Sequence, residues 1–248
     1  MKQLSAPLLS ATLAVALSSC ASLSKRPTAI DADAELVLSK ASATLAAAES
    51  YSFRIQRDVP AALAEAAGIR GKADIRVSAV RPNRVAAVRG SGTSEARFYY
   101  DGSSITLYDA GTNSYAAAEA PATTDEMIQQ LDEQWGIRPP LAGMLVSTPF
   151  ASRGIKSTKG GELVGTEEIA GEPCDHLKIL GDGVQWDLWI SKRDYLPRRF
   201  DVTVTELEGS PRGVTTISEW NTDANLSPNL FEANIPAGAT RREMSEMP

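Results

Sequence analysis

The feature that most constrains the fold of this chain is a long series of short segments in which apolar and polar residues alternate. Residues 51–59 show the pattern clearly, with one side formed by Phe53, Ile55, Arg57 and Val59. Alternation of this kind is typical of a β-strand with one buried face. The turn-rich separators between segments are too short to hold crossover helices, so the sequence predicts an antiparallel sheet.

The same alternation predicts about eleven strands in two groups. The first group is expected at 51–59, 69–80, 84–89, 96–101, 104–110 and 114–118. The second group is expected at 162–169, 174–180, 185–191, 197–207 and 213–220, with a final edge at 231–235. A helix over 33–50, with an apolar stripe through Leu36, Ala41 and Leu45, precedes both groups.

A helical insert separates the two groups of strands. Thr123 and Glu126 have the spacing of a capping box, and Gly136 is placed to end the helix that follows. A second apolar segment opens at Pro139 and ends near Pro149. Strands on both sides of a helical insert, after a first helix, predict an α+β fold built on one large curved sheet.

The N-terminus has the features of a bacterial export signal. Residues 1–19 combine Lys2 with an apolar stretch too short to span a bilayer, followed by small residues. The tetrapeptide Leu17-Ser18-Ser19-Cys20 resembles the lipobox of bacterial lipoproteins, in which the cysteine is acylated and becomes a membrane anchor. An ordinary signal peptide cut nearby, with Cys20 incidental, is the alternative.

These segments define an expected domain organisation. Residues 1–19 form the signal peptide, 20–32 the lipidated cysteine and a polar tether, and 33–248 a single domain. The expected location is the bacterial envelope, facing the periplasm, with acyl chains such as palmitate on Cys20. Ala21 favours the outer membrane over the inner one, according to a general sorting pattern of Gram-negative bacteria.

Composition argues against several classes of function. A net charge of −6 gives no general attraction for nucleic acid. The single histidine, His176, argues against a dedicated metal site, and we expect no cofactor. Cys174 and His176 share a face of one predicted strand, which supplies a thiol and an imidazole for nucleophilic catalysis. No oxyanion hole or orienting group accompanies them, so the expectation is a protein that is not an enzyme.

Several motifs resemble a known family. The segments 81–85 (Arg-Pro-Asn-Arg-Val), 98–102 (Phe-Tyr-Tyr-Asp-Gly) and 105–109 resemble the LolA/LolB-like lipoprotein carriers. The later segments 121–150, 174–177 and 186–190 look more like a periplasmic branch of that superfamily, DUF2092. The resemblance covers about residues 33–240. It implies a half-barrel of about eleven strands, lidded by helices, whose cavity accepts acyl chains.

This resemblance, together with the apolar faces, predicts a ligand site between sheet and helices. The expected ligand-binding residues on the strands are Phe53, Ile55, Ile75, Val77, Phe98, Tyr100, Leu107, Leu188, Ile190, Phe200 and Val202. The expected ones in the helical insert are Met127, Leu131, Trp135, Leu141 and Met144. The predicted function is therefore an anchored lipoprotein that binds a lipid, a lipoprotein acyl chain or another hydrophobic ligand. The alternative is a structural lipoprotein with a filled core and an envelope protein partner.

Overall fold

The computed structural model describes residues 29–66, 71–150 and 158–247. The predicted signal peptide, Cys20 and most of the predicted tether lie outside these described residues. Among the described residues, no helix combines the length and the hydropathy needed to cross a bilayer.

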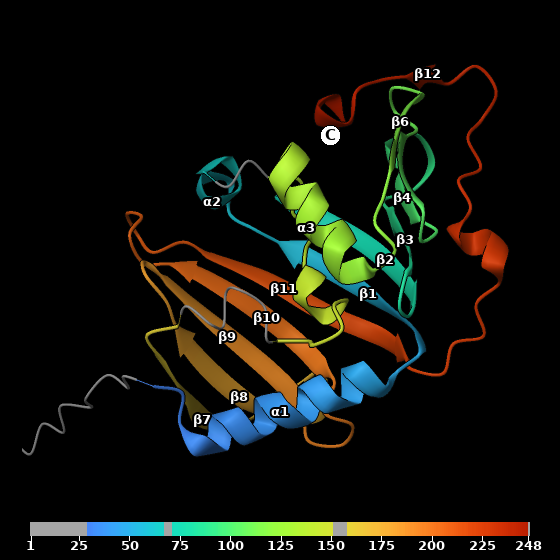
Figure 1. The fold of residues 1–248 in the computed structure, drawn as a ribbon. Helices are drawn as coiled ribbons and strands as arrows, with labels where there is room; N and C mark the ends of the chain where they lie inside the picture. Colours follow the sequence, from blue (N-terminus) through green and yellow to red (C-terminus); the bar gives the residue numbers. More distant parts are fainter. Residues whose placement is uncertain (1–28, 67–70, 151–157, 248) are drawn as a thin grey trace, which may run out of the picture.

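One large, open, curved sheet of twelve strands dominates the fold (Figure 1). Its first six strands are β1 (Ser50–Asp58), β2 (Lys72–Val80), β3 (Arg84–Arg89), β4 (Ala96–Tyr100), β5 (Ser104–Asp109) and β6 (Ser114–Glu119). The others are β7 (Gly160–Ile169), β8 (Glu172–Leu180), β9 (Val184–Ser191), β10 (Pro197–Val204), β11 (Arg212–Asn221) and β12 (Thr240–Arg241). The predicted α+β half-barrel is confirmed, with β12 as one strand more than expected.

The sheet consists of two antiparallel meanders joined through their first and last strands. Its order is β12-β6-β5-β4-β3-β2-β1-β11-β10-β9-β8-β7, so β1 pairs with β11 as well as with β2. Among the twelve described strands, β12 alone runs parallel to its neighbour, β6. This order lets a chain of mostly local hairpins form one continuous surface with an inner, covered face.

The register places the apolar side of the alternation on that inner face. Ile55 of β1 lies opposite Ile217 of β11 on one side and Ile75 of β2 on the other. Arg57 stands two residues further along β1 and therefore also projects from the inner face. The outer face of the same strand carries Arg54, which pairs with Asp74 at 2.8 Å (Nε to Oδ1).

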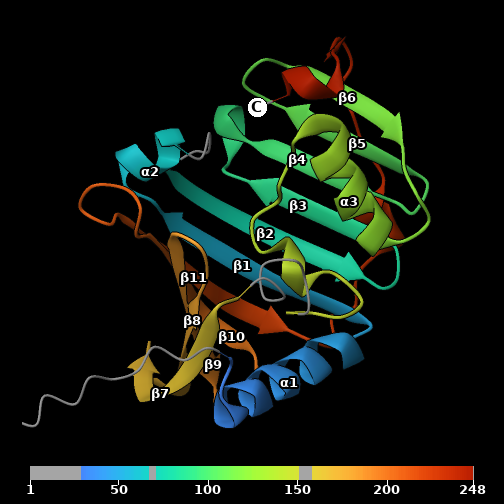
Figure 2. The ribbon, with the colours of Figure 1, turned by 60° about the vertical axis from the view of Figure 1, so that its left-hand side comes forward.

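Different segments cover the two halves of the inner face (Figure 2). Helix α3 (Thr124–Trp135) and the short 3-10 helix η2 (Ala142–Met144) lie over the β1–β6 half. Helix α1 (Ala32–Ala47) lies over the β7–β10 half. A small helix, α2 (Ala61–Ala66), follows β1 and packs through Leu63 against Val59.

The predicted signals at the ends of α3 are present. Thr123 is the N-cap residue: its hydroxyl accepts from the backbone N–H of Glu126 at 3.3 Å and donates to the Glu126 carboxylate at 2.8 Å. Gly136 ends the helix in the left-handed region, with φ of 66°. The helix begins and ends where the sequence predicts because both caps are local.

Helix α1 buries a somewhat different set of residues from the apolar stripe that the sequence predicted. Its buried residues are Ala34, Val37, Leu38, Ala41 and Leu45, whereas Leu36 is 54% exposed. Leu36 was therefore wrongly included in the buried stripe. The reason is that small alanines, Ala34 and Ala41, lie against the sheet and allow the helix backbone to approach it closely.

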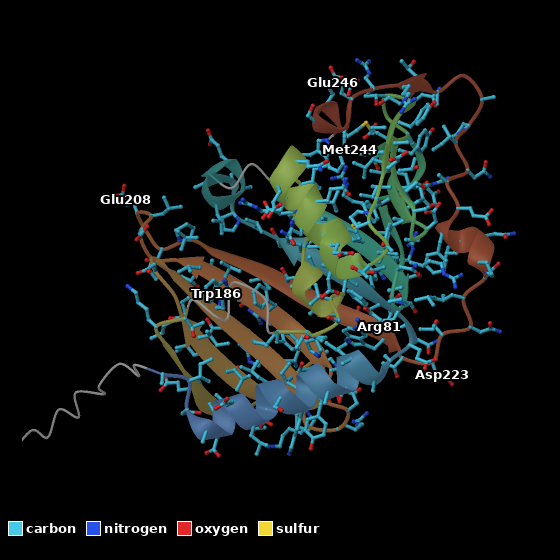
Figure 3. All side chains as sticks on the ribbon, viewed as in Figure 1. Arg81, Trp186, Glu208, Asp223, Met244 and Glu246 are labelled. Atoms are coloured by element: carbon cyan, nitrogen blue, oxygen red, sulfur yellow. The ribbon has the colours of Figure 1, made fainter. Side chains whose placement is uncertain are left out.

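The C-terminal segment corrects another expectation. Residues 228–231 form the 3-10 helix η3, so the strand predicted at 231–235 is wrong. After η3 the chain passes the edge of the sheet, adds β12 beside β6, and ends in the 3-10 helix η4 (Met244–Glu246). Met244 is labelled in Figure 3, on the segment above α3, and its side chain is buried in the core of that half.

The Arg-Pro-Asn motif connects the covering segments to the sheet. The Arg81 guanidinium donates from Nη1 to the carbonyl oxygens of Leu145 (3.1 Å) and Val146 (2.8 Å), and from Nη2 to that of Leu45 (3.1 Å). It thereby joins the end of α1 to the segment after η2, and its guanidinium carbon lies 5.3 Å from the centroid of the Tyr51 ring.

The Asp-Gly turn packs against the same motif. The Asp101 carboxylate accepts from the backbone N–H groups of Ser103 and Ser104, each at 2.8 Å. Gly102 has φ of 94°, and a Cβ added there would lie 2.5 Å from Nδ2 of Asn83. The turn needs glycine both for its backbone conformation and for this close approach.

Candidate functional site

A cavity of about 790 Å³ lies between the inner face of β1–β5 and the segments that cover it. Its floor comes from β1 to β5, and its roof from α3, residues 136–140, Leu145 and the C-terminal segment. The volume falls in the range of small-molecule sites, about 300–1,000 Å³. A smaller groove of about 320 Å³ lies between α3 and residues 137–146, and its lining includes the acidic side chains Asp125 and Glu133.

Many of the predicted ligand-binding residues meet in this cavity. The predicted residues that line it are Ile55, Ile75, Val77, Phe98, Leu107, Met127 and Trp135. Strand register accounts for the arrangement, because Val77 pairs with Ala87, Ala87 pairs with Phe98, and Phe98 pairs with Leu107. Alanines at inner positions such as 87 and 96 leave space where larger side chains would reach α3.

Other predicted residues lie in the packed core around the cavity. Phe53, Tyr100, Leu131 and Met144 are all at most 3% exposed and belong to the same apolar cluster, outside the cavity lining. Tyr100 uses its hydroxyl to donate to the Pro121 carbonyl oxygen at 2.7 Å, and burial raises its pKa to about 12. These residues hold the cavity walls in place.

Of the remaining predicted residues, Leu141 packs at the margin of the cluster beneath α3, and Leu188, Ile190 and Phe200 belong to a second cluster under α1. Leu188 and Ile190 are buried against Val37 and Leu38, and Phe200 packs at the margin of this second cluster. Val202 stands two residues beyond Phe200 on the same face of β10. The sheet therefore has one filled half beneath α1 and one hollow half beneath α3.

The sequence analysis did not assign several residues that line the cavity. The most distinctive are Arg57 and Arg89, which project from the inner faces of β1 and β3. A signal was present for Arg57, because it occupies the apolar side of the alternation in β1. Met244 and Met247 also line the cavity, but no local pattern indicates that the C-terminal segment returns to the sheet.

The charge around the cavity has one sign. Among the described residues that line it, the charged ones are Arg57, Arg89, Arg97 and Arg138, and none is acidic. Arg97 Nε bonds Glu95 at 2.5 Å, and Arg138 Nε bonds Asp132 at 2.7 Å. Burial lowers the pKa of Arg57 from its usual value.

Cys174 and His176 have different hydrogen-bond partners in the structure. The Cys174 side chain is fully buried, its thiol donates to the Glu172 carbonyl oxygen at 3.4 Å, and burial raises its pKa to about 11. The His176 ring bonds Glu167 through Nδ1 and Asp187 through Nε2, both at 2.8 Å. The imidazole is thus part of a polar network with Glu167 and Asp187.

A comparison with protein-family models decides the family. Residues 34–244 match the family described as "Predicted periplasmic protein (DUF2092)". The chain belongs to this family. The match spans nearly all of the described fold and confirms the family recognised from the sequence. No curated protein matches the chain in sequence.

Several solved structures are similar to this DUF2092 protein at low sequence identity. LprF from Mycobacterium bovis is 14% identical, with 85% of this chain and 99% of LprF covered and a TM-score of 0.50. MucB is 12% identical with a TM-score of 0.47, and the match covers 82% of this chain but only 63% of MucB. A LolA superfamily protein from Nitrosomonas europaea is 12% identical, with 80% and 97% covered and a TM-score of 0.36.

Proposed function

We propose that this DUF2092 protein binds a hydrophobic ligand, such as a lipid or the acyl chain of a lipoprotein, in the cavity beneath α3. The observation that carries the proposal is a cavity of about 790 Å³ whose lining is mostly apolar. Each methylene group of an acyl chain that leaves water for such a lining contributes about 0.8 kcal/mol. The burial of an acyl chain of common length therefore contributes enough free energy for useful binding affinity without polar contacts.

The composition of the roof supports the same function. Met127, Met244 and Met247 face the cavity together with Trp135. Methionine is unbranched and polarisable, so a roof rich in methionine adapts to acyl chains of different lengths. The filled-core alternative fits only the α1 half of the sheet.

We further propose that residues 1–19 are a signal peptide, that 20–32 are the lipidated cysteine and tether, and that 33–248 are a single ligand-binding domain. Acylated Cys20 would hold this domain on the periplasmic side of a membrane, the outer membrane in preference to the inner one. Replacing Cys20 by Ala tests the anchor. We expect loss of radioactive palmitate incorporation, whereas unchanged labelling of the C20A protein would contradict it.

A pair of neighbouring substitutions tests ligand binding. Ala87 lines the cavity, and Val88 lies next to it on the outer face. We expect Ala87→Trp to fill the cavity and to weaken binding of a fluorescent apolar probe at least ~10-fold, with the fold unchanged by circular dichroism. Val88→Trp is the matched control and should bind the probe like the wild type. Equal binding by both variants would contradict the proposed site.

A further inference from the structure

One end of the proposed ligand cavity is closed by packed side chains. The inner positions that follow the cavity lining along β1, β2 and β4 are Phe53, Ala79 and Tyr100, and each is at most 3% exposed. Above them, Thr124 at the start of α3 bonds the Pro82 carbonyl oxygen through its backbone N–H at 3.0 Å and through its hydroxyl at 2.9 Å. A ligand cannot enter at this end without displacing packed core.

Another part of the cavity is covered by the C-terminal segment 240–247. Strand β12 adds to the edge of the sheet at β6, and η4 then lies beside α3 (Figures 1 and 2). Met244 and Met247 line the cavity from this segment, and Met244 is only 5% exposed. The residues at 241–243 and 245–246 are exposed. The segment thus presents methionines to the cavity and polar side chains to solvent.

The backbone bonds of this segment lie at the exposed edge of the sheet. The Thr240 N–H donates to the Asn113 carbonyl oxygen at 2.9 Å. The Arg242 N–H donates to the Tyr115 carbonyl oxygen at 2.8 Å. Strand β12 itself has two residues, and both are exposed. Hydrogen bonds in such a setting open at a lower free-energy cost than those of the core strands.

The segment is built to move as a unit. Within η4, the side chains of Glu243 and Glu246 each accept a hydrogen bond from the backbone N–H of the other, so the turn is held by its own residues. Upstream, Phe231 of η3 is 1% exposed and anchors the chain, whereas residues 232–234 and 236–238 are exposed. An exposed connection therefore links a fixed anchor to a self-capped turn that carries the two methionines.

We infer that residues 240–247 form a C-terminal strap that closes the cavity and lifts away from β6 to let the hydrocarbon ligand enter and leave. The inference rests on the proposed function and adds how access to the site is controlled. Helix α3 is tied to the sheet at Thr124 and again at Gln130, whose side chain donates to the Glu119 carbonyl oxygen at 3.1 Å. The movement is therefore assigned to the strap, and its two methionines cover the ligand when it closes.

Binding kinetics distinguish a moving strap from a fixed wall. Stopped-flow fluorescence with the neutral probe 1-N-phenylnaphthylamine compares the chain from Ala21 onward, which retains every described residue, with the same chain ending at Ala239. We expect loss of the strap to raise both the association and the dissociation rate constants at least ~10-fold, because entry through an open state populated at about 10% or less is limited to that fraction. Loss of a fixed wall would raise the dissociation rate constant alone.

A point substitution tests the same movement in a chain of full length. Met244→Ser keeps the segment but removes the buried apolar side chain that holds it down, so we expect both rate constants to rise. Leu230→Ser is the matched control: Leu230 lies in η3, is 39% exposed and is outside the cavity lining, and its substitution should leave both rate constants unchanged. Circular dichroism verifies folding, and M244S decides the question if the shortened chain does not fold.

The outcomes separate this inference from the function on which it rests. An association rate constant that stays unchanged in the folded shortened chain, or in M244S, would overturn the strap and leave the hydrophobic site standing. An equal rise in L230S and M244S would also overturn it. Failure of the wild type to bind the probe or any hydrocarbon ligand would overturn the proposed function as well.

Discussion

At the scale of single residues, Leu45 and Leu36 occupy one helix in opposite environments. Leu45 is fully buried between α1 and the sheet, whereas Leu36 is 54% exposed. We expect Leu45→Ala to lower the free energy of unfolding by about 3 kcal/mol, because it leaves a cavity in packed core. Leu36→Ala, the matched control, should change it by less than about 0.5 kcal/mol. Urea denaturation measures both, and a similar cost for the two variants would contradict the described orientation of α1.

Cys174 provides a second test at this scale. Burial raises its pKa to about 11, so only about one molecule in a thousand carries the thiolate at pH 8. In the chain from Ala21 onward, which lacks Cys20, we expect a thiol reagent to label the folded protein far more slowly than the protein in urea. Rapid labelling of the folded protein would contradict the described burial of the Cys174 side chain.

The residue scale also shows what sequence patterns can and cannot predict. Period-two alternation placed Ile55, Ile75 and Phe98 on one face, because the side chains of a strand alternate strictly. It could not separate Phe98, which lines the cavity, from Phe53, which is packed beside it. That distinction depends on which side chains of the roof stand opposite each residue, and those contacts are distant in sequence.

At the scale of secondary-structure elements, Arg81 joins helix α1 to the segment after η2. Its three hydrogen bonds reach carbonyl oxygens of α1 and of the segment after η2. We expect Arg81→Ala to lower the free energy of unfolding by about 2 kcal/mol or more, because carbonyl groups lose charge-assisted donors. Arg76→Ala, on the exposed outer face, should cost less than about 0.5 kcal/mol in the same denaturation assay. An equal effect of both would contradict the joining role.

The β8–β10 region makes a prediction about acid stability. Glu172 accepts from the Ser191 hydroxyl and from Arg198 Nε, the latter at 2.9 Å, and these bonds lower its pKa. A carboxylate with a lowered folded pKa stabilises the fold above its unfolded pKa, about 4.3, and this stability is lost as the pH falls through the folded pKa. We expect Glu172→Gln to be less stable than the wild type at pH 6, with the difference narrowing toward pH 3.

The control for this effect lies on the neighbouring strand. Glu168 of β7 is exposed. We expect Glu168→Gln to stay within about 0.5 kcal/mol of the wild type across the same pH range. A difference for Glu172→Gln that does not depend on pH would show that its effect comes from packing and not from charge.

At the scale of the whole molecule, the two halves of the sheet differ in how they are covered. Helix α1 comes directly before β1, lies close to the sheet through small residues, and fills its half. The roof of the other half is assembled from α3, the loop after it and the C-terminal segment. A roof assembled from several separate segments leaves space more readily than one continuous helix, and the hollow half is where these segments meet.

The sequence separation between contacting residues explains which parts of the fold could be predicted. Hairpins are local, so turn residues and alternation predicted most strands and the antiparallel order within each meander. The final edge at 231–235 was wrong, because pairing of β12 with β6 joins residues more than a hundred positions apart. The place of Arg57 and Arg89 in the cavity lining escaped prediction for the same reason, because it depends on the pairing of β1, β2 and β3.

The central claim is that a hydrocarbon chain occupies the space between the sheet and α3. The most direct measurement uses a palmitate analogue with a photoreactive group at the end of its chain, followed by peptide mapping of the cross-links. We predict cross-links on the lining, at positions such as Phe98, Met127 and Trp135, and competition by unlabelled palmitate. Cross-links confined to the outer face or to the α1 half, or labelling that palmitate does not compete, would contradict the claim.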